Sequence, residues 1–94
     1  MLVVGRKKLA DFMVRHPQAR APLQAWLAEA TAASWKMWAD IKSRYPTADL
    51  VKDGKVVFNI KGNSFRLVVL VSYVNDVLVI DRIGTHAEYS KWNL

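Results

Sequence analysis

The chain has 94 residues, of which 52% are hydrophobic and 23% charged, and it contains no cysteine. This composition is typical of one packed domain, residues 1–94, and excludes a disordered chain, a disulfide scaffold and a thiolate metal site. A net charge of +6 and a pI near 9.9 favour a polyanionic partner, either nucleic acid or an acidic protein surface. The longest apolar run is too short to span a bilayer and no secretory signal is present, so we expect a cytoplasmic protein without a membrane partner.

The first half of the chain carries helical patterns. A short strand at residues 2–4 precedes a helix over residues 6–16. Pro22 suits the first turn of a second helix that should pack on the first, and Ser34 can cap a third helix that Pro46 ends. The apolar positions recur at helical spacing and predict the buried sides of these helices: Leu9, Phe12, Met13, Leu23, Trp26, Leu27, Ala30, Trp35, Trp38, Ile41 and Tyr45.

The second half changes to alternating apolar and polar residues, which predicts an antiparallel meander. The predicted strands occupy residues 56–60, 65–73 and 77–83. Alternation assigns five residues to the side that covers the helices: Phe58, Ile60, Phe65, Leu67 and Val69. The other side should be half exposed and carries four polar residues: Lys55, Asn59, Lys61 and Arg66. We therefore expect an α+β fold with N-terminal helices packed on one face of a small, mainly antiparallel sheet.

The first hairpin sets the pairing of two polar residues. Its connection is residues 61–63, in which Gly62 and Asn63 can both adopt the positive φ angles of a tight turn. Such a turn pairs Asn59 with Arg66 across the two strands. Both side chains then lie on the half-exposed side of the sheet.

The second hairpin leaves two registers open. A three-residue loop at residues 74–76 would put Arg82 on the same face as Arg66. A two-residue loop at residues 75–76 would put Asp81 there and send Arg82 to the other side. Only one of these two side chains is therefore expected on the face of Arg66.

The segment GTHAEY at the end of the third strand is the most informative part of the chain. Thr85, followed three residues later by Glu88, forms a capping box, so a short C-terminal helix should begin there with His86 in its first turn. Exposed backbone N–H groups at a helix start attract anions, so this place suits a phosphate group. Because Arg66 should pair near the end of the third strand, it converges with His86 and Tyr89 without a metal or another cofactor.

Two segments together resemble a known family. They are VFNIKGNSFRLV at residues 57–68 and IGTHAEY at residues 83–89, and further matching positions are Trp38, Ile41, Tyr45, Pro46, Ala48 and Asp49. Over nearly its whole length the chain resembles the HigB toxins, type II toxin-antitoxin proteins of the RelE/ParE superfamily. The resemblance implies a RelE-like fold and an mRNA interferase that enters the ribosomal A site and cuts messenger RNA. It also implies a HigA-type helix-turn-helix antitoxin that holds the toxin inactive.

The chemistry of the implied reaction indicates roles for individual residues. RNA cleavage by attack of a 2′-hydroxyl on the adjacent phosphate needs a base, an acid and stabilisation of negative charge. Arg66 would stabilise the charge, His86 would act as base or acid, and Tyr89 would orient the 2′-hydroxyl or stack on a base. With the lysines as point charges for backbone phosphates, the expected RNA-binding residues are Lys55, Asn59, Lys61, Asn63 and Lys91.

Several alternatives stay open from the sequence. The pair Asp81-Arg82 departs from the family pattern, in which a basic residue precedes an aromatic one. The acid could weaken phosphate binding, or it could pair with Arg66 or Arg82 and position that side chain. His86 could be only a helix-start residue with local hydrogen bonds, and His16 is expected to have no chemistry. A non-enzymatic toxin that binds DNA gyrase and a noncatalytic RNA-binding module are the alternative functions.

Overall fold

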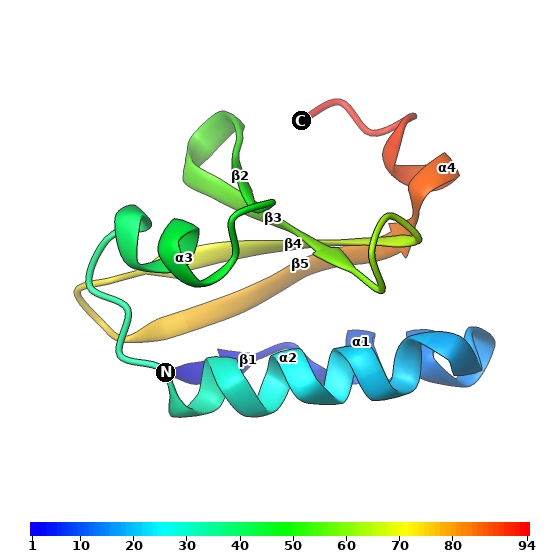
Figure 1. Ribbon diagram of the computed structural model, residues 1–94, viewed down its shortest axis with the longest axis horizontal. Coiled ribbons are helices and arrows are strands. Elements are labelled where there is room, and N and C mark those ends of the chain that lie inside the picture. Colours follow the sequence, from blue (N-terminus) through cyan, green and yellow to red (C-terminus); the bar gives the residue numbers. More distant parts are fainter.

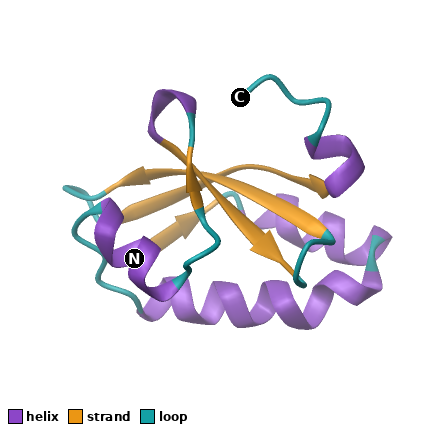
Figure 2. Ribbon diagram, turned by 45° about the horizontal axis from the view of Figure 1, so that its top comes forward, coloured by secondary structure: helices purple, strands orange, loops and turns teal.

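The computed structural model describes all 94 residues, which form four α-helices and one five-stranded sheet (Figures 1 and 2). In chain order the elements are β1 (Leu2–Val4), α1 (Arg6–Arg15), a 3₁₀ turn (Pro17–Ala19), α2 (Arg20–Ala32), α3 (Trp38–Arg44), β2 (Asp49–Leu50), a second 3₁₀ turn (Lys52–Gly54), β3 (Lys55–Ile60), β4 (Phe65–Ser72), β5 (Val77–Thr85) and α4 (His86–Tyr89). The strand order is β1-β5-β4-β3-β2, in which β1 and β5 are parallel and all other neighbours antiparallel. The predicted α+β class, mainly antiparallel sheet and short C-terminal helix are confirmed. No helix is long and apolar enough to cross a membrane.

The core lies between the sheet and the two long helices, which run beneath the strands in Figure 1. Leu9 and Phe12 of α1 and Leu23 and Trp26 of α2 are at most 2% exposed. They share one apolar cluster with the strand residues that alternation assigned to this side: Phe58, Ile60, Phe65, Leu67 and Val69. Because full burial of such a side chain contributes about 1.5–3 kcal/mol, this cluster is the main source of stability.

The third helix begins later than the sequence predicted. Ser34 does not cap it; α3 starts at Trp38 with Met37 as the N-cap residue. The carboxylate of Asp40 accepts a hydrogen bond of 2.8 Å from the backbone N–H of Lys36, so a side chain inside the helix fixes the chain before it. Because residues 33–37 are not helical, Trp35 can reach the core, where its ring centroid lies 6.3 Å from that of Phe58. The predicted end before Pro46 is confirmed.

The first hairpin has the predicted register, because Asn59 is paired with Arg66. The turn, however, extends over residues 61–64, and the positive φ angles fall on Lys61 (53°) and Gly62 (61°). The prediction of a positive φ at Asn63 was therefore wrong. The four-residue turn moves the left-handed pair one position earlier and leaves Asn63 free to turn its side chain toward the sheet.

The second hairpin follows neither predicted register. Ser72 pairs with Val77, so the loop comprises residues 73–76, and a β-bulge interrupts the pairing further along β5. Val68 faces Arg82 while Val69 faces Ile80, which leaves Asp81 as the extra residue. The expectation that only Asp81 or Arg82 shares the face of Arg66 was wrong. A bulge sets two residues against one, so both side chains lie on that face.

We call the side of the sheet away from α1 and α2 the open face. Figure 1 shows β2 with its following turn, α4 and the C-terminal segment on this side. The centre of the open face is more enclosed than predicted, because Val57 and Val68 are at most 2% exposed and Arg66 only 7%. Four apolar side chains at its other end are exposed: Leu2, Val4, Leu70 and Val79.

Candidate active site

Arg66 lies at the centre of the candidate site on β4. Its Nη1 donates hydrogen bonds to the backbone oxygens of Asn63 (3.1 Å) and Phe65 (3.2 Å), and its Nη2 donates to Oδ1 of Asn63. No ion pair forms between Arg66 and a carboxylate. A buried guanidinium surrounded only by neutral oxygens keeps its full positive charge, so the site favours an anion.

The short helix α4 is fixed beside Arg66 by its capping box. The Thr85 hydroxyl accepts from the Glu88 N–H (3.1 Å), and the Glu88 carboxylate accepts from the Thr85 N–H (2.8 Å). This backbone hydrogen bond from Thr85 is the main reason that the pKa of Glu88 lies below its ordinary value. The predicted start of the helix at the capping box is confirmed.

Three backbone N–H groups at the start of α4, those of Thr85, His86 and Glu88, are occupied. Besides the two bonds of the capping box, the His86 N–H donates to the backbone oxygen of Ser64 at 3.0 Å. The expectation that exposed N–H groups at this helix start would bind a phosphate is therefore wrong for Thr85, His86 and Glu88, because local acceptors already use them. Of the N–H groups in this turn only that of Ala87 has no acceptor within the chain, so anion binding here depends mainly on side chains. The imidazole of His86 is exposed to solvent.

Two arginines with two aromatic rings between them form a row that extends from Arg66 across the open face. The Arg66 guanidinium carbon lies 5.5 Å from the centroid of the Tyr89 ring. Tyr89 meets Trp92 edge to face at 5.8 Å, and the guanidinium carbon of Arg82 lies 5.1 Å from the Trp92 ring. Trp92 was not identified from the sequence as part of the site. The feature that could have indicated a large side chain here is Gly84, the residue opposite Arg66 in the sheet, which has no side chain of its own.

Asp81 pairs with two cations other than Arg66. Its Oδ2 lies 3.3 Å from Nζ of Lys55 and 3.4 Å from Nε of Arg82. Of the two arginines with which the sequence allowed this acid to pair, it pairs with Arg82 and not with Arg66. Lys55 is thereby partly neutralised, at the far end of β3 from the first turn.

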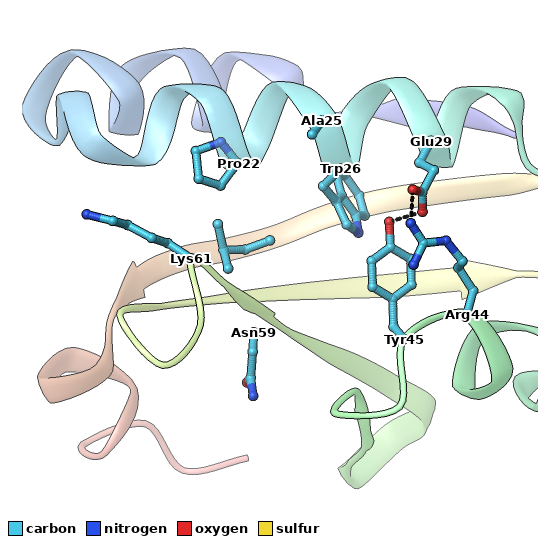
Figure 3. Close-up of a pocket in the computed structure, with 9 residues that line it drawn as sticks. Pro22, Ala25, Trp26, Glu29, Arg44, Tyr45, Asn59 and Lys61 are labelled. Carbon is cyan, nitrogen blue, oxygen red and sulfur yellow. Dashed lines mark hydrogen bonds and ion pairs between the residues drawn. The ribbon is translucent and has the colours of Figure 1, made fainter.

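The remaining predicted RNA-binding residues lie around the first hairpin and α4. Lys61 is exposed on the turn, Asn63 holds Arg66, and Lys91 is exposed just after α4. Asn59 is half-buried on β3, and Figure 3 shows its side chain pointing away from Trp26 and Glu29 toward the open face.

The groove drawn in Figure 3 lies on the α2 side of the first hairpin, and its lining includes the predicted RNA-binding residues Asn59 and Lys61. It has a volume of about 170 Å³ and lies between α2, the end of α3 and the edge of β3. Glu29 accepts hydrogen bonds from Arg44 and from the hydroxyl of Tyr45. Burial and this contact with Glu29 raise the pKa of Tyr45 above its ordinary value. Glu29, Arg44 and Tyr45 thus engage one another in structural interactions, in which Asn59 and Lys61 take no part.

His16 lies closer to the site than the sequence suggested. Its ring stacks on Phe12 at 4.4 Å and lies 5.7 Å from the ring of Phe65. After the hydrogen bonds with Thr85, the neighbouring side chains of His16 and Arg15 also help to lower the pKa of Glu88. The C-terminal end of α1 therefore contributes positive potential next to α4. No group of three or more His, Cys, Asp or Glu side chains is arranged to hold a metal ion.

Comparison with known proteins agrees with this geometry. Residues 19–92 match the family model HigB_toxin, described as the RelE-like toxic component of a toxin-antitoxin system. The chain is 30% identical over 91 residues to the mRNA interferase toxin HigB of Escherichia coli (strain K12). These residues make up 95% of this chain and 88% of that protein. The mRNA interferases HigB of Escherichia coli O157:H7 and Shigella flexneri match to the same extent. The chain therefore belongs to the HigB toxin family, the RelE-like toxic components of toxin-antitoxin systems.

Proposed function

We propose that this toxin is an endoribonuclease that cleaves messenger RNA and so inhibits translation. The observation that carries the proposal is the buried guanidinium of Arg66, which has no carboxylate partner and lies beside Tyr89 and α4. A free buried cation next to an aromatic ring and an exposed imidazole suits a phosphodiester flanked by bases. The relatives named mRNA interferase support the same activity.

The proposed reaction is a transesterification within the RNA. A 2′-hydroxyl loses its proton and attacks the adjacent phosphorus, the bond to the 5′-oxygen breaks, and that oxygen takes up a proton. Arg66 stabilises the charge that develops on the non-bridging oxygens, because its guanidinium is always protonated and can donate two parallel hydrogen bonds. His86 transfers a proton as base or acid, and Tyr89 orients the 2′-hydroxyl or stacks on a base.

The RNA backbone would follow the open face past the first turn. Lys61 is an exposed cation on the first turn beside α2, Lys91 is exposed just after α4, and Lys55 adds a weaker charge because Asp81 pairs with it. Asn59 and Asn63 supply hydrogen-bonding groups, with Asn63 acting mainly through Arg66. Phosphate contacts of this kind position the chain without reading its sequence.

The partners follow from the same proposal. Messenger RNA is met in the A site of a translating ribosome in the cytoplasm, where ribosomal RNA would contact the basic surface. The antitoxin is a HigA-type helix-turn-helix protein that covers part of the open face and blocks the site. Membership of a toxin-antitoxin family supports an antitoxin partner, and the net charge of +6 supports polyanionic contacts.

The test is primer-extension mapping of messenger RNA after brief induction of the toxin, alongside the variant His86→Ala. We expect cuts inside translated regions that weaken by about 10²–10⁴-fold in the variant, as for loss of a proton-transfer group. Co-purification of the variant with the antitoxin serves as the folding control, and Lys7→Ala, an exposed change on α1, serves as the matched neutral variant. Growth arrest without such cuts would redirect the search to a protein target such as DNA gyrase.

A further inference from the structure

Gly84 leaves a notch in the open face that the Trp92 side chain fills. A Cβ atom added at Gly84 would lie 2.7 Å from Cζ2 and 2.8 Å from Cη2 of Trp92, closer than van der Waals contact allows. Gly84 is buried and pairs with Arg66 on the neighbouring strand. The indole edge of Trp92 therefore rests directly on the backbone beside Arg66, at a place that only glycine keeps open.

Trp92 is tied to α4 by backbone as well as by its ring. The Ser90, Lys91 and Trp92 N–H groups donate to the oxygens of His86, Glu88 and Tyr89 at 3.0–3.1 Å, so the chain continues the turn of α4 as far as Trp92. The Trp92 ring then meets Tyr89 edge to face at 5.8 Å and lies 5.1 Å from the guanidinium carbon of Arg82. The same side chain contacts the sheet, the tyrosine and the second arginine.

A helix of one turn is not stable by itself, because nucleation costs more than its few hydrogen bonds return. The capping box at Thr85 and the bond from His86 to Ser64 fix only the first end of α4. Trp92 on Gly84 fixes the other end. With both ends held, His86 and Tyr89 keep one orientation relative to Arg66.

We propose that Trp92, seated on Gly84, is a positioning residue that holds Tyr89 and Arg82 at the phosphate site of Arg66. The inference rests on the proposed RNA cleavage, for which it adds a residue outside the reacting groups. Misplacement of reacting groups by about 1 Å can lower a rate about 10²-fold. Loss of the contact should therefore slow the chemical step more than it weakens RNA binding.

The experiment is a double-mutant cycle of Gly84→Ala and Trp92→Ala, measured as single-turnover cleavage of messenger RNA in a translating extract with toxin in excess. Each single change should lower the maximal rate about 10–100-fold, with less than about 3-fold change in the half-saturating toxin concentration. Adding Gly84→Ala to Trp92→Ala should cost less than about 2-fold more, because without the indole the new methyl group meets only the end of the flexible Glu88 side chain, at 3.2 Å from Oε1. Trp92→Phe should recover part of the rate, since a smaller ring still contacts Tyr89.

The readouts separate positioning from folding. Loss of folded protein would raise the half-saturating concentration and leave the maximal rate unchanged, which would overturn the proposal. Multiplicative effects of the two changes, or a Trp92→Ala enzyme as fast as wild type, would also overturn it while the nuclease function stands. Absence of cuts by the wild-type toxin would overturn both. Val74→Ala, at a side chain 96% exposed on the second hairpin, is the matched control.

Discussion

Arg66 combines burial with an unneutralised charge. Isolated buried charges are costly, and the bonds from its guanidinium to oxygens of Asn63 and Phe65 replace part of the lost hydration. A guanidinium has five N–H donors, so these contacts leave donors for a phosphate. Asn63, expected mainly to form a turn, instead orients the arginine. Arg66 thus supplies the charge, and Asn63 sets the orientation of its guanidinium.

Replacing Arg66 with lysine tests whether the site needs the oriented N–H donors of the guanidinium as well as its positive charge. We expect Arg66→Lys to lower the single-turnover cleavage rate about 10²–10³-fold, close to the loss in Arg66→Ala, because an ammonium cannot hold the Asn63 oxygens and a phosphate with parallel bonds. Both variants should melt within a few degrees of each other. A lysine variant with nearly full activity would mean that a point charge is sufficient.

The helix α4 depends on interactions outside its own four residues. Its start is held by the capping box and by Ser64, and the basic end of α1 lies near Glu88. Because the pKa of Glu88 is lowered in the folded chain, its ionised form is the one that stabilises the cap. This contribution is present above the ordinary carboxyl pKa of 4.5 and is lost as the pH falls through the lower folded value.

Acid should therefore loosen the start of α4 before it unfolds the protein. We expect the Thr85 amide resonance to shift as the pH falls below the ordinary carboxyl range, since this N–H loses its ionised acceptor. In Glu88→Gln the acceptor does not titrate, so the same resonance should stay nearly constant. NMR titration of both proteins measures this. Equal titration of the Thr85 amide in the two proteins would show that another carboxyl group causes it.

The molecule places its two functional layers on opposite sides of the sheet. The apolar cluster with α1 and α2 fixes the strands, and the open face carries Arg66, Arg82 and α4 at its enclosed end. The net charge of +6 is spread over both sides, as with Lys7, which pairs with Asp11 on α1. Only the cations on the open face are expected to touch RNA.

Salt dependence distinguishes these two sets of charges. The logarithm of the association constant for a single-stranded RNA should fall linearly with the logarithm of the salt concentration, with a slope of about −0.7 for each phosphate contact. Lys61→Ala and Lys91→Ala should each reduce the slope by about 0.7–1. Lys7→Ala should leave it unchanged. Fluorescence anisotropy at several salt concentrations provides the measurement, and equal effects of all three lysines would mean that RNA senses only the overall charge.

Much of the site could be predicted because its determinants are local. The capping box of Thr85 and Glu88 needs only residues of one turn. A short turn between β3 and β4 places Asn59 opposite Arg66, and alternation assigns both to one face. The resemblance to the HigB family rested on these same segments and is confirmed by the family match. The catalytic and RNA-binding roles of the individual residues stay predictions.

Other features depend on contacts between segments that are distant in the chain. The bulge that brings Asp81 onto the open face arises from pairing between β4 and β5. The later start of α3 allows Trp35 to pack against Phe58. Trp92 can lie in the site only because Gly84 has no side chain to occupy the same space. Periodicity and capping act over a few residues and can be read along the sequence, whereas packing depends on which surfaces meet after folding.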